Sequence, residues 1–228
     1  IHCGLVGSEM CIRDSAIVGP TGSGKTTITN LITKFYEVDT GDILIDGKDV
    51  NHYNLETLRS KIGVILQDVF LFADTIFNNI TLYNKDITIE DVENAAKELE
   101  IHDFINSLPG GYSFNVSERG ATLSAGQKQL IAFLRVLVNN PDILILDEAT
   151  SSIDSYSEEL LKNATKKITK DKTSIIIAHR LSTIESADKI IYMENGKILE
   201  SGNHKHLLSI PNGKFKKLYE EQFVEELV

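Results

Sequence analysis

The amino-acid sequence predicts an α/β fold with a mostly parallel sheet, an antiparallel β part and an inserted α-helical subdomain. Short β-branched or aliphatic runs, of which Ile143-Leu144-Ile145-Leu146 is the clearest, alternate with helical patterns toward both ends of the chain. Strands separated by helices form parallel sheets that are covered on both faces. Residues from about 75 to 138 contain no strand pattern, and their apolar residues recur at helical spacing. This middle segment is therefore predicted to be the inserted helical subdomain.

Each element follows from a local pattern. In chain order, we expect strands at 16–18, 42–46, 62–66, 143–146 and 174–178. Helices are expected from a Gly-rich loop to about residue 34, at 55–61, at 127–138, at 155–170, and where Ile89, Val92, Ala96 and Leu99 follow helical spacing. Residues 189–198 are expected to form a hairpin that turns at Glu194-Asn195-Gly196, because Asn-Gly is a strong hairpin signal.

The composition is typical of one soluble globular domain. The chain has 228 residues, enough for a buried core, and 42% of them are hydrophobic. A formal net charge of -10 argues against nucleic-acid binding, which needs a basic footprint. No apolar run reaches the 18 or so residues of a membrane span, so we expect this chain not to cross a bilayer by itself. Both cysteines lie within the first eleven residues, so a reducing compartment is expected.

The first fifteen residues differ in character from the rest. Residues 1–15 mix Gly, Cys, Met and isolated charges without a clear period, and they lack the basic start and apolar run of a signal peptide. We interpret this segment as a scar or a truncated end, with the domain itself spanning residues 16–228.

A phosphate-binding loop follows the first predicted strand. Gly19, Pro20, Thr21, Gly22, Ser23, Gly24, Lys25 and Thr26 fit the pattern G-x-x-x-x-G-K-[ST] of a P-loop NTPase core. Glycines let the backbone curl so that successive N–H groups point at phosphate oxygens, and the following helix contributes its dipole. Lys25 would add a charge on the β- and γ-phosphates of ATP, and the Thr26 hydroxyl would ligate Mg²⁺. A chance Gly-rich turn is the alternative, but the strand before and the helix after favour the phosphate site.

Two carboxylates follow the clearest strand. Asp147 and Glu148 stand at the C-terminal end of the 143–146 strand, where open α/β sheets bind ligands. Asp147 is suited to hold Mg²⁺, commonly through water, and Glu148 is suited to activate the attacking water. A solvated strand end is the alternative for this pair taken alone.

A capping box opens the helix at 127–138. Ser124 and Gln127 form the S-x-x-Q pattern, so Ser124 is the expected N-cap. The exposed helix N-terminus can receive an anion. Taken alone, an ordinary helix cap explains the pattern equally well.

Together these motifs resemble the nucleotide-binding domain of an ABC (ATP-binding cassette) exporter, over about residues 16 to 225. The specific feature is the ordered set: residues 19–26, Gln67, Leu123-Ser124-Ala125-Gly126-Gln127, Asp147-Glu148, Ser152-Ile153-Asp154 and His179.

The resemblance implies a role for each motif. Thr27 would join residues 19–26 in binding ATP, and Gln67, beside Thr26 and Asp147, would contact Mg²⁺ and the attacking water. His179 would hydrogen-bond the γ-phosphate and help order Glu148. Ser124, Ala125, Gly126, Gln127 and Asp154 would lie against nucleotide across the interface with a partner domain. The segments 68–72 and 118–120 would contact the transmembrane domain of the exporter.

Two departures from the family pattern stand out. The third residue of the signature is Ala125 rather than Gly; Ala is a good residue just inside a helix start, so we expect the site to work. With residues 127–130 after it, this variant resembles one subunit of two-component multidrug exporters. The family also stacks adenine on an aromatic residue before the loop, yet residues 1–18 contain no Phe, Tyr or Trp. Such stacking is worth roughly 1–3 kcal/mol, so weaker ATP binding is expected.

The implied function is ATP hydrolysis that powers export. The partners implied are a second nucleotide-binding domain, identical or related, and a transmembrane domain fused upstream, which together place the chain at the cytoplasmic face of the cell membrane. A monomer is expected to hydrolyse ATP poorly, because the second chain would supply half of each site.

Three rival functions fit the sequence less well. DNA-repair or chromosome-maintenance ATPases share the signature but insert long coiled coils, whereas Ser124 follows Lys25 by only 99 residues here (124 − 25 = 99). A non-hydrolytic binding module is disfavoured by the presence of Glu148 and His179. A GTPase is disfavoured because residues 84–87 do not fit the guanine-reading N-K-x-D pattern.

Overall fold

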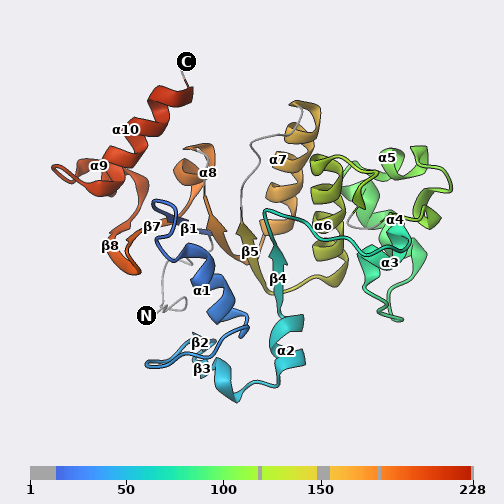
Figure 1. Ribbon diagram of the computed structural model, residues 1–228, viewed down its shortest axis with the longest axis horizontal. Helices are drawn as coiled ribbons and strands as arrows, with labels where there is room; N and C mark the ends of the chain where they lie inside the picture. The colour runs from blue at the N-terminus through green and yellow to red at the C-terminus, as the bar shows by residue number, and fades with distance from the viewer. Residues whose placement is uncertain (1–13, 118–119, 148–154, 179–180, 227–228) are drawn as a thin grey trace. The chain divides into compact units, whose positions relative to one another are not determined.

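The computed structural model describes residues 14–117, 120–147, 155–178 and 181–226. The chain divides into two compact units (Figure 1). The first comprises Ile1–Ile62, Ile143–Ala149 and Asp171–Val228, and the second comprises Gly63–Asp142 and Thr150–Lys170. The segment 75–138, expected to form the helical subdomain, falls within the second unit, which also takes in the following helix.

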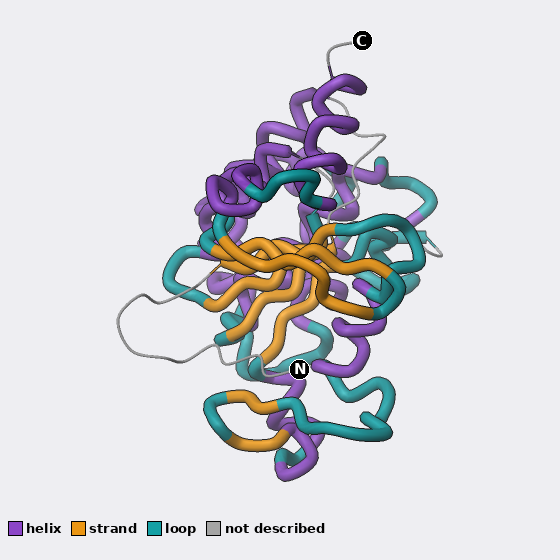
Figure 2. The backbone as a smooth tube through the Cα atoms, turned by 90° about the vertical axis from the view of Figure 1, so that its left-hand side faces the viewer, coloured by secondary structure: helices purple, strands orange, loops and turns teal. Residues whose placement is uncertain are grey.

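A twisted sheet is the centre of the first unit (Figure 2). Within this unit the strand order is β5-β6-β1-β7-β8. The bounds are β1 Asp14–Val18, β5 Ile143–Asp147, β6 Thr173–Ile177, β7 Lys189–Glu194 and β8 Lys197–Gly202. Neighbours pair in parallel except β7 and β8, which are antiparallel. The mostly parallel sheet with an antiparallel part is therefore confirmed.

Strand β1 begins at Asp14, two residues before the expected start. Asp14 pairs with Ser174 of β6, whose hydroxyl donates to the Asp14 carboxylate. The backbone N–H of Asp14 donates to Asp188 Oδ2 at 3.1 Å. Ala16 and Ile17 are buried between the two neighbouring strands. Residues 1–13 lie outside the described residues, so the interpretation of this segment stays a prediction.

A separate two-stranded hairpin belongs to the same unit (Figure 2). Strands β2 (Leu44–Ile45) and β3 (Lys48–Asp49) are shorter than the strand expected at 42–46. The turn between them, Asp46-Gly47, has φ of 51° and 73°, and such a two-residue turn matches the twist of a hairpin. The short helices η1 (Val50–His52) and α2 (Leu55–Ser60) follow.

Four further helices belong to the first unit. They are α1 (Lys25–Ile32), α8 (Leu181–Ser186), α9 (His204–Ser209) and α10 (Lys214–Glu226). Helix α1 ends two residues earlier than expected, because Lys34 has a φ of 54° and leaves the helix. The Arg59 guanidinium donates to the carbonyls of Thr33 and Lys34, both at 3.3 Å, and so satisfies this end. Helices α8 to α10 have no counterpart among the predicted elements.

The second unit is a helical bundle around α6. Strand β4 (Ile62–Ile65) runs into this unit, followed by α3 (Ile76–Thr81), α4 (Ile89–Glu98), α5 (His102–Ser107), η2 (Gly111–Ser113), α6 (Ala125–Asn139) and α7 (Ser155–Thr169). Helix α6 packs against α3, α4 and α7, and it buries Leu130, Ile131 and Leu134. Apart from the single bridge between Thr75 and Asn115, the described part of 75–138 contains no strand pairing, as predicted.

Among the described residues, no helix is both long and apolar enough to cross a membrane.

Candidate nucleotide-binding site

The phosphate-binding motif forms the loop between β1 and α1. Gly19, Gly22 and Gly24 have φ of 148°, 79° and 100°, in the region that side chains other than glycine rarely adopt. The N–H of Ser23 donates to Pro20 O at 3.1 Å, which closes the curl. The glycine positions of the motif are thus the positions where the backbone turns.

Lys25 lies inside this curl. The residue is only 8% exposed, and its ammonium donates to Gly19 O at 2.8 Å and to Pro20 O at 3.1 Å. Burial lowers the pKa of Lys25, and the charge of Asp147 partly opposes this by raising it. The negative charge of Asp147 therefore acts on the Lys25 ammonium.

Two features of the loop fit a phosphate ligand. Gly24 is the N-cap of α1, and no described side chain caps this helix end. The Ser23 hydroxyl is buried and has no hydrogen-bond partner among the described residues. Buried polar groups without protein partners call for a ligand, and an uncapped helix N-terminus favours an anion. Thr26 and Thr27, in the first turn of α1, are exposed.

Asp147 is the last residue of β5. Its backbone pairs with Ile177 of β6, and Ile17 of β1 pairs with the same residue on the other side. The strands are parallel, so Asp147 and the loop after β1 lie at the same edge of the sheet. Of the described residues, no group of three or more His, Cys, Asp or Glu side chains could hold a metal ion. Thr26 and Asp147 carry oxygen atoms, the ligand type that Mg²⁺ prefers, and their role as Mg²⁺ ligands stays a prediction.

The signature motif caps α6 in the second unit. The Ser124 hydroxyl accepts from the N–H of Gln127 at 3.2 Å, and Gln127 Oε1 accepts from the N–H of Ser124 at 2.9 Å. The predicted capping box is thus confirmed, and α6 begins two residues before the expected start. Ser124 and Ala125 are exposed, whereas Gly126 is buried.

The remaining predicted residues fall in two groups. Gln67 follows β4 and is exposed, in the second unit together with residues 124–127. Glu148, Asp154 and His179 lie outside the described residues, as do Glu118 and Arg119. The roles assigned to all these residues stay predictions.

The β7–β8 hairpin contacts the phosphate loop, which the motifs did not predict. The N–H of Gly196, in the hairpin turn, donates to Ser23 O at 3.0 Å. A Cβ on Gly19 would stand 2.0 Å from the carbonyl oxygen of Met193. These residues reach the loop through the pairing of β7 with β1, so local sequence carries no signal for the contact beyond the Asn195-Gly196 turn itself.

Fold and loop together define a P-loop nucleotide-binding domain. The model of the ABC transporter family matches residues 13–151, well over half of the chain. The chain belongs to the ABC transporter family, and it is an ATP-binding domain of that family.

Similar proteins are longer than this chain. YgaD of Bacillus subtilis, named as a multidrug export ATP-binding/permease protein, is 48% identical over 207 residues, which cover 86% of this chain and 36% of YgaD. A Staphylococcus aureus protein of the same description is also 48% identical, covering 91% of this chain and 36% of its own length. The solved structure of a bacterial Atm1-family ABC exporter with ATP bound has a TM-score of 0.82 and 41% identity, covering 95% of this chain and 37% of that one. This chain thus spans about a third of these relatives.

Proposed function

We propose that this chain hydrolyses ATP and that hydrolysis powers an exporter of the multidrug type. The observation that carries the proposal is the Lys25 ammonium, enclosed by the Gly19–Thr26 loop and electrostatically coupled to Asp147. The similarity to multidrug export ATP-binding/permease proteins supports the link to export.

The loop supplies most of the binding chemistry. Its backbone N–H groups and the N-terminus of α1 would hold the phosphate chain, and Lys25 would exchange its two carbonyl partners for β- and γ-phosphate oxygens. When bound, Mg²⁺ would neutralise charge on the phosphates, with Thr26, Asp147 and Gln67 as its candidate ligands.

Glu148 is the proposed general base. It follows Asp147, the last residue of β5, directly in the sequence. A carboxylate at this position would take a proton from the attacking water and direct its oxygen at the γ-phosphorus. His179 would hydrogen-bond the γ-phosphate and help to orient Glu148.

A second domain would complete the site. Ser124 and Ala125 are exposed at the N-terminus of a 15-residue helix, where backbone dipoles favour an anion. We propose that this helix end, with Gly126, Gln127 and Asp154, meets the ATP held by a second copy or a related subunit. Closure would exclude water around the γ-phosphate, and loss of that phosphate would let the domains separate. A transmembrane domain of the exporter would transmit this motion and place the chain at the cytoplasmic face of the cell membrane.

The test separates binding from turnover. Glu148→Gln keeps the size of the side chain but cannot accept a proton at neutral pH, so phosphate release should stop while ATP binding persists. Glu159→Gln, at an exposed position of α7, makes the same charge change and should leave both unchanged. Undiminished phosphate release by Glu148→Gln would overturn the assignment of the base.

A further inference from the structure

The C-terminal helix α10 is joined to the phosphate loop through the β7–β8 hairpin, and all three lie in the first unit. We propose that Glu200 is a positioning residue for ATP binding: by holding the N-terminus of α10, it fixes the hairpin that supports the phosphate loop. The inference rests on the proposed function of that loop.

The first link is between loop and hairpin. Gly19 approaches the hairpin so closely that even a Cβ would lie 2.0 Å from Met193 O, and Gly196 donates its N–H to Ser23 O at 3.0 Å. A Cβ on Gly24 would lie 3.7 Å from the Cα of Gly196. The loop therefore contacts the hairpin at Gly19, Ser23 and Gly24, and a shift of the hairpin must move the loop or break these contacts.

The second link runs through a bulge in the hairpin. The register between β7 and β8 shifts between Tyr192 and Met193, and Tyr192 pairs with Glu200 on the other strand. A β-bulge bends its strand and redirects the groups beside it. The extra residue is Leu199 of β8, which lies between Ile198 and Glu200, the partners of Met193 and Tyr192. Glu200 therefore stands at the bulge, across from the residue that precedes Met193, whose carbonyl lies against Gly19.

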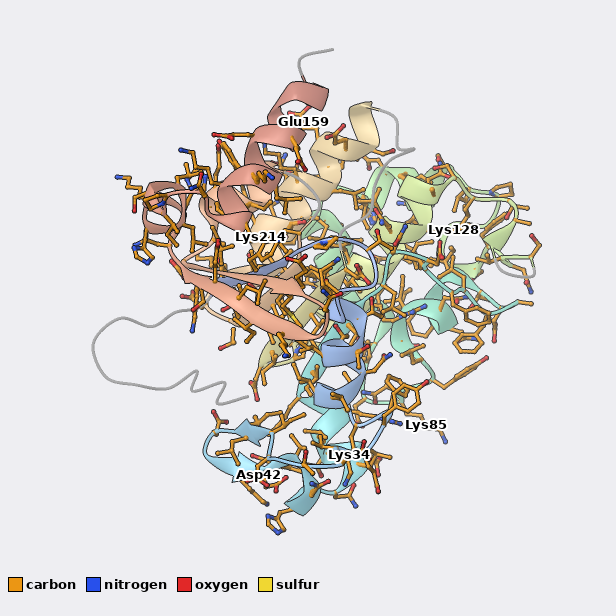
Figure 3. The ribbon with its side chains drawn as sticks, turned by 60° about the vertical axis from the view of Figure 1, so that its left-hand side comes forward. Lys34, Asp42, Lys85, Lys128, Glu159 and Lys214 are labelled. Atoms are coloured by element: carbon orange, nitrogen blue, oxygen red, sulfur yellow. The ribbon has the colours of Figure 1, made fainter. Side chains whose placement is uncertain are left out.

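The third link joins the hairpin to α10. Glu200 accepts two backbone hydrogen bonds from the start of the helix, with Oε1 at 2.6 Å from the N–H nitrogen of Lys214 and Oε2 at 3.0 Å from that of Phe215. The Lys214 ammonium donates to Glu194 Oε1 at 3.5 Å and lies 3.1 Å from Oε2, in ion-pair range. Figure 3 labels Lys214, the first residue of α10. A carboxylate at a helix N-terminus also interacts favourably with the helix dipole.

Apolar contacts keep α10 against this unit. Phe215 is fully buried, and the ring of His204 in α9 meets it edge-on at 6.0 Å between centroids. The Tyr219 hydroxyl donates to Glu185 of α8 at 2.6 Å. The N-terminus of α10 is thus docked by packing. Glu200 ties the docked helix to β8, and the Lys214–Glu194 contact ties it to β7, the strand beside β1.

Binding and docking must then be linked in both directions. If docked α10 favours the loop conformation that binds ATP, ATP must favour docked α10 by the same factor. The amides of α10 should therefore exchange with solvent more slowly in the presence of ATP. A helix that only adds stability would gain no more protection than ligand binding gives to the rest of the chain.

The test uses Glu200→Gln in the full chain, with Glu220→Gln as the matched control. Gln has one carbonyl oxygen, so its amide NH₂ would face one of the two N–H groups that Glu200 now accepts. Glu220 lies on the same helix, 4.0 Å from Lys216, and its side chain is 63% exposed. Its replacement removes the same charge without touching the hairpin contacts.

Isothermal titration with ATP and hydrogen exchange of residues 214–226 are the measurements. We expect Glu200→Gln to weaken ATP binding about 5-fold or more, the scale of a typical coupling between sites. It should also abolish the slowing of exchange by ATP, whereas Glu220→Gln changes affinity by no more than about 2-fold, as is usual for surface positions.

Equal ATP affinity and equal protection in Glu200→Gln and the control would overturn the inference, while ATP binding by the unmodified chain would still support the proposed function. Failure of the unmodified chain to bind ATP would overturn both. If Glu200→Gln does not fold, Lys214→Met keeps the two backbone hydrogen bonds and removes only the contact with Glu194, and a weaker but parallel loss is expected.

Discussion

Replacing Gly19 by alanine should destroy the phosphate site without unfolding the chain. A new Cβ would lie 2.0 Å from Met193 O, whereas real Cβ contacts essentially never fall below 3.0 Å. The neighbour is backbone of a central strand, so it cannot rotate away, and the loop must move by about 1 Å. A displacement of that size in a site of defined geometry costs on the order of 100-fold in catalytic efficiency.

Gly47→Ala is the control for the backbone strain that alanine causes at a glycine with a positive φ. Gly47 also has a positive φ, 73°, but no atom lies within 4 Å of its would-be Cβ. Alanine there should cost roughly 1 kcal/mol of stability and leave nucleotide binding unchanged. ATP affinity by titration calorimetry and the urea midpoint are the assays for both variants. If Gly19→Ala bound ATP as tightly as Gly47→Ala does, the contact with Met193 would not shape the loop.

Three further predictions concern single side chains. The Arg135 guanidinium donates to Asn79 O at 2.9 Å and to Phe70 O at 3.4 Å, so Arg135→Met should lower the free energy of unfolding by about 1–3 kcal/mol, and an unchanged urea midpoint would contradict this. Ser124→Ala removes the α6 cap and should cost about 1 kcal/mol in the same assay. Because burial lowers the pKa of Lys25, the ammonium that holds phosphate is lost at lower pH than for an ordinary lysine. ATP affinity should therefore fall as the pH rises through that lowered pKa, and a calorimetric affinity that begins to fall no earlier than an ordinary lysine would lose its proton would contradict this.

Local motifs predicted the parts of the site that one short segment builds. The Gly19–Thr26 pattern encodes its own loop, since the glycines coincide with the positive φ angles and Lys25 sits one helix position inside. Ser124 and Gln127 cap α6 for the same reason: both halves of a capping box lie within four residues.

Contacts made by sheet pairing could not be predicted in this way. Met193 meets Gly19 because β7 lies beside β1, and 174 residues separate the two positions in the chain (193 − 19 = 174). Glu200 likewise caps a helix that begins 14 residues later, through side-chain oxygens rather than a local capping box. Such contacts depend on tertiary arrangement, which residue spacing does not report.

Helix α10 shows a different limit. Its charged residues, such as Lys216 and Glu220, dilute the apolar pattern, and much of its packing comes from Phe215, which is buried against α9. The β7–β8 hairpin, in contrast to α10, was predicted from the sequence. Its Asn195-Gly196 turn carries a strong local signal and adopts φ of 50° and 72°.

The most direct test of the central claim is an ATP titration of this chain beside Lys25→Met and Lys97→Met. Lys25 is enclosed by the loop carbonyls, whereas Lys97 is an exposed lysine of α4 that lies 3.9 Å from Glu93. The account predicts that Lys97→Met binds ATP like the unmodified chain and that Lys25→Met loses at least about 10-fold in affinity, equal to about 1.4 kcal/mol. Equal ATP affinity in all three proteins would contradict it.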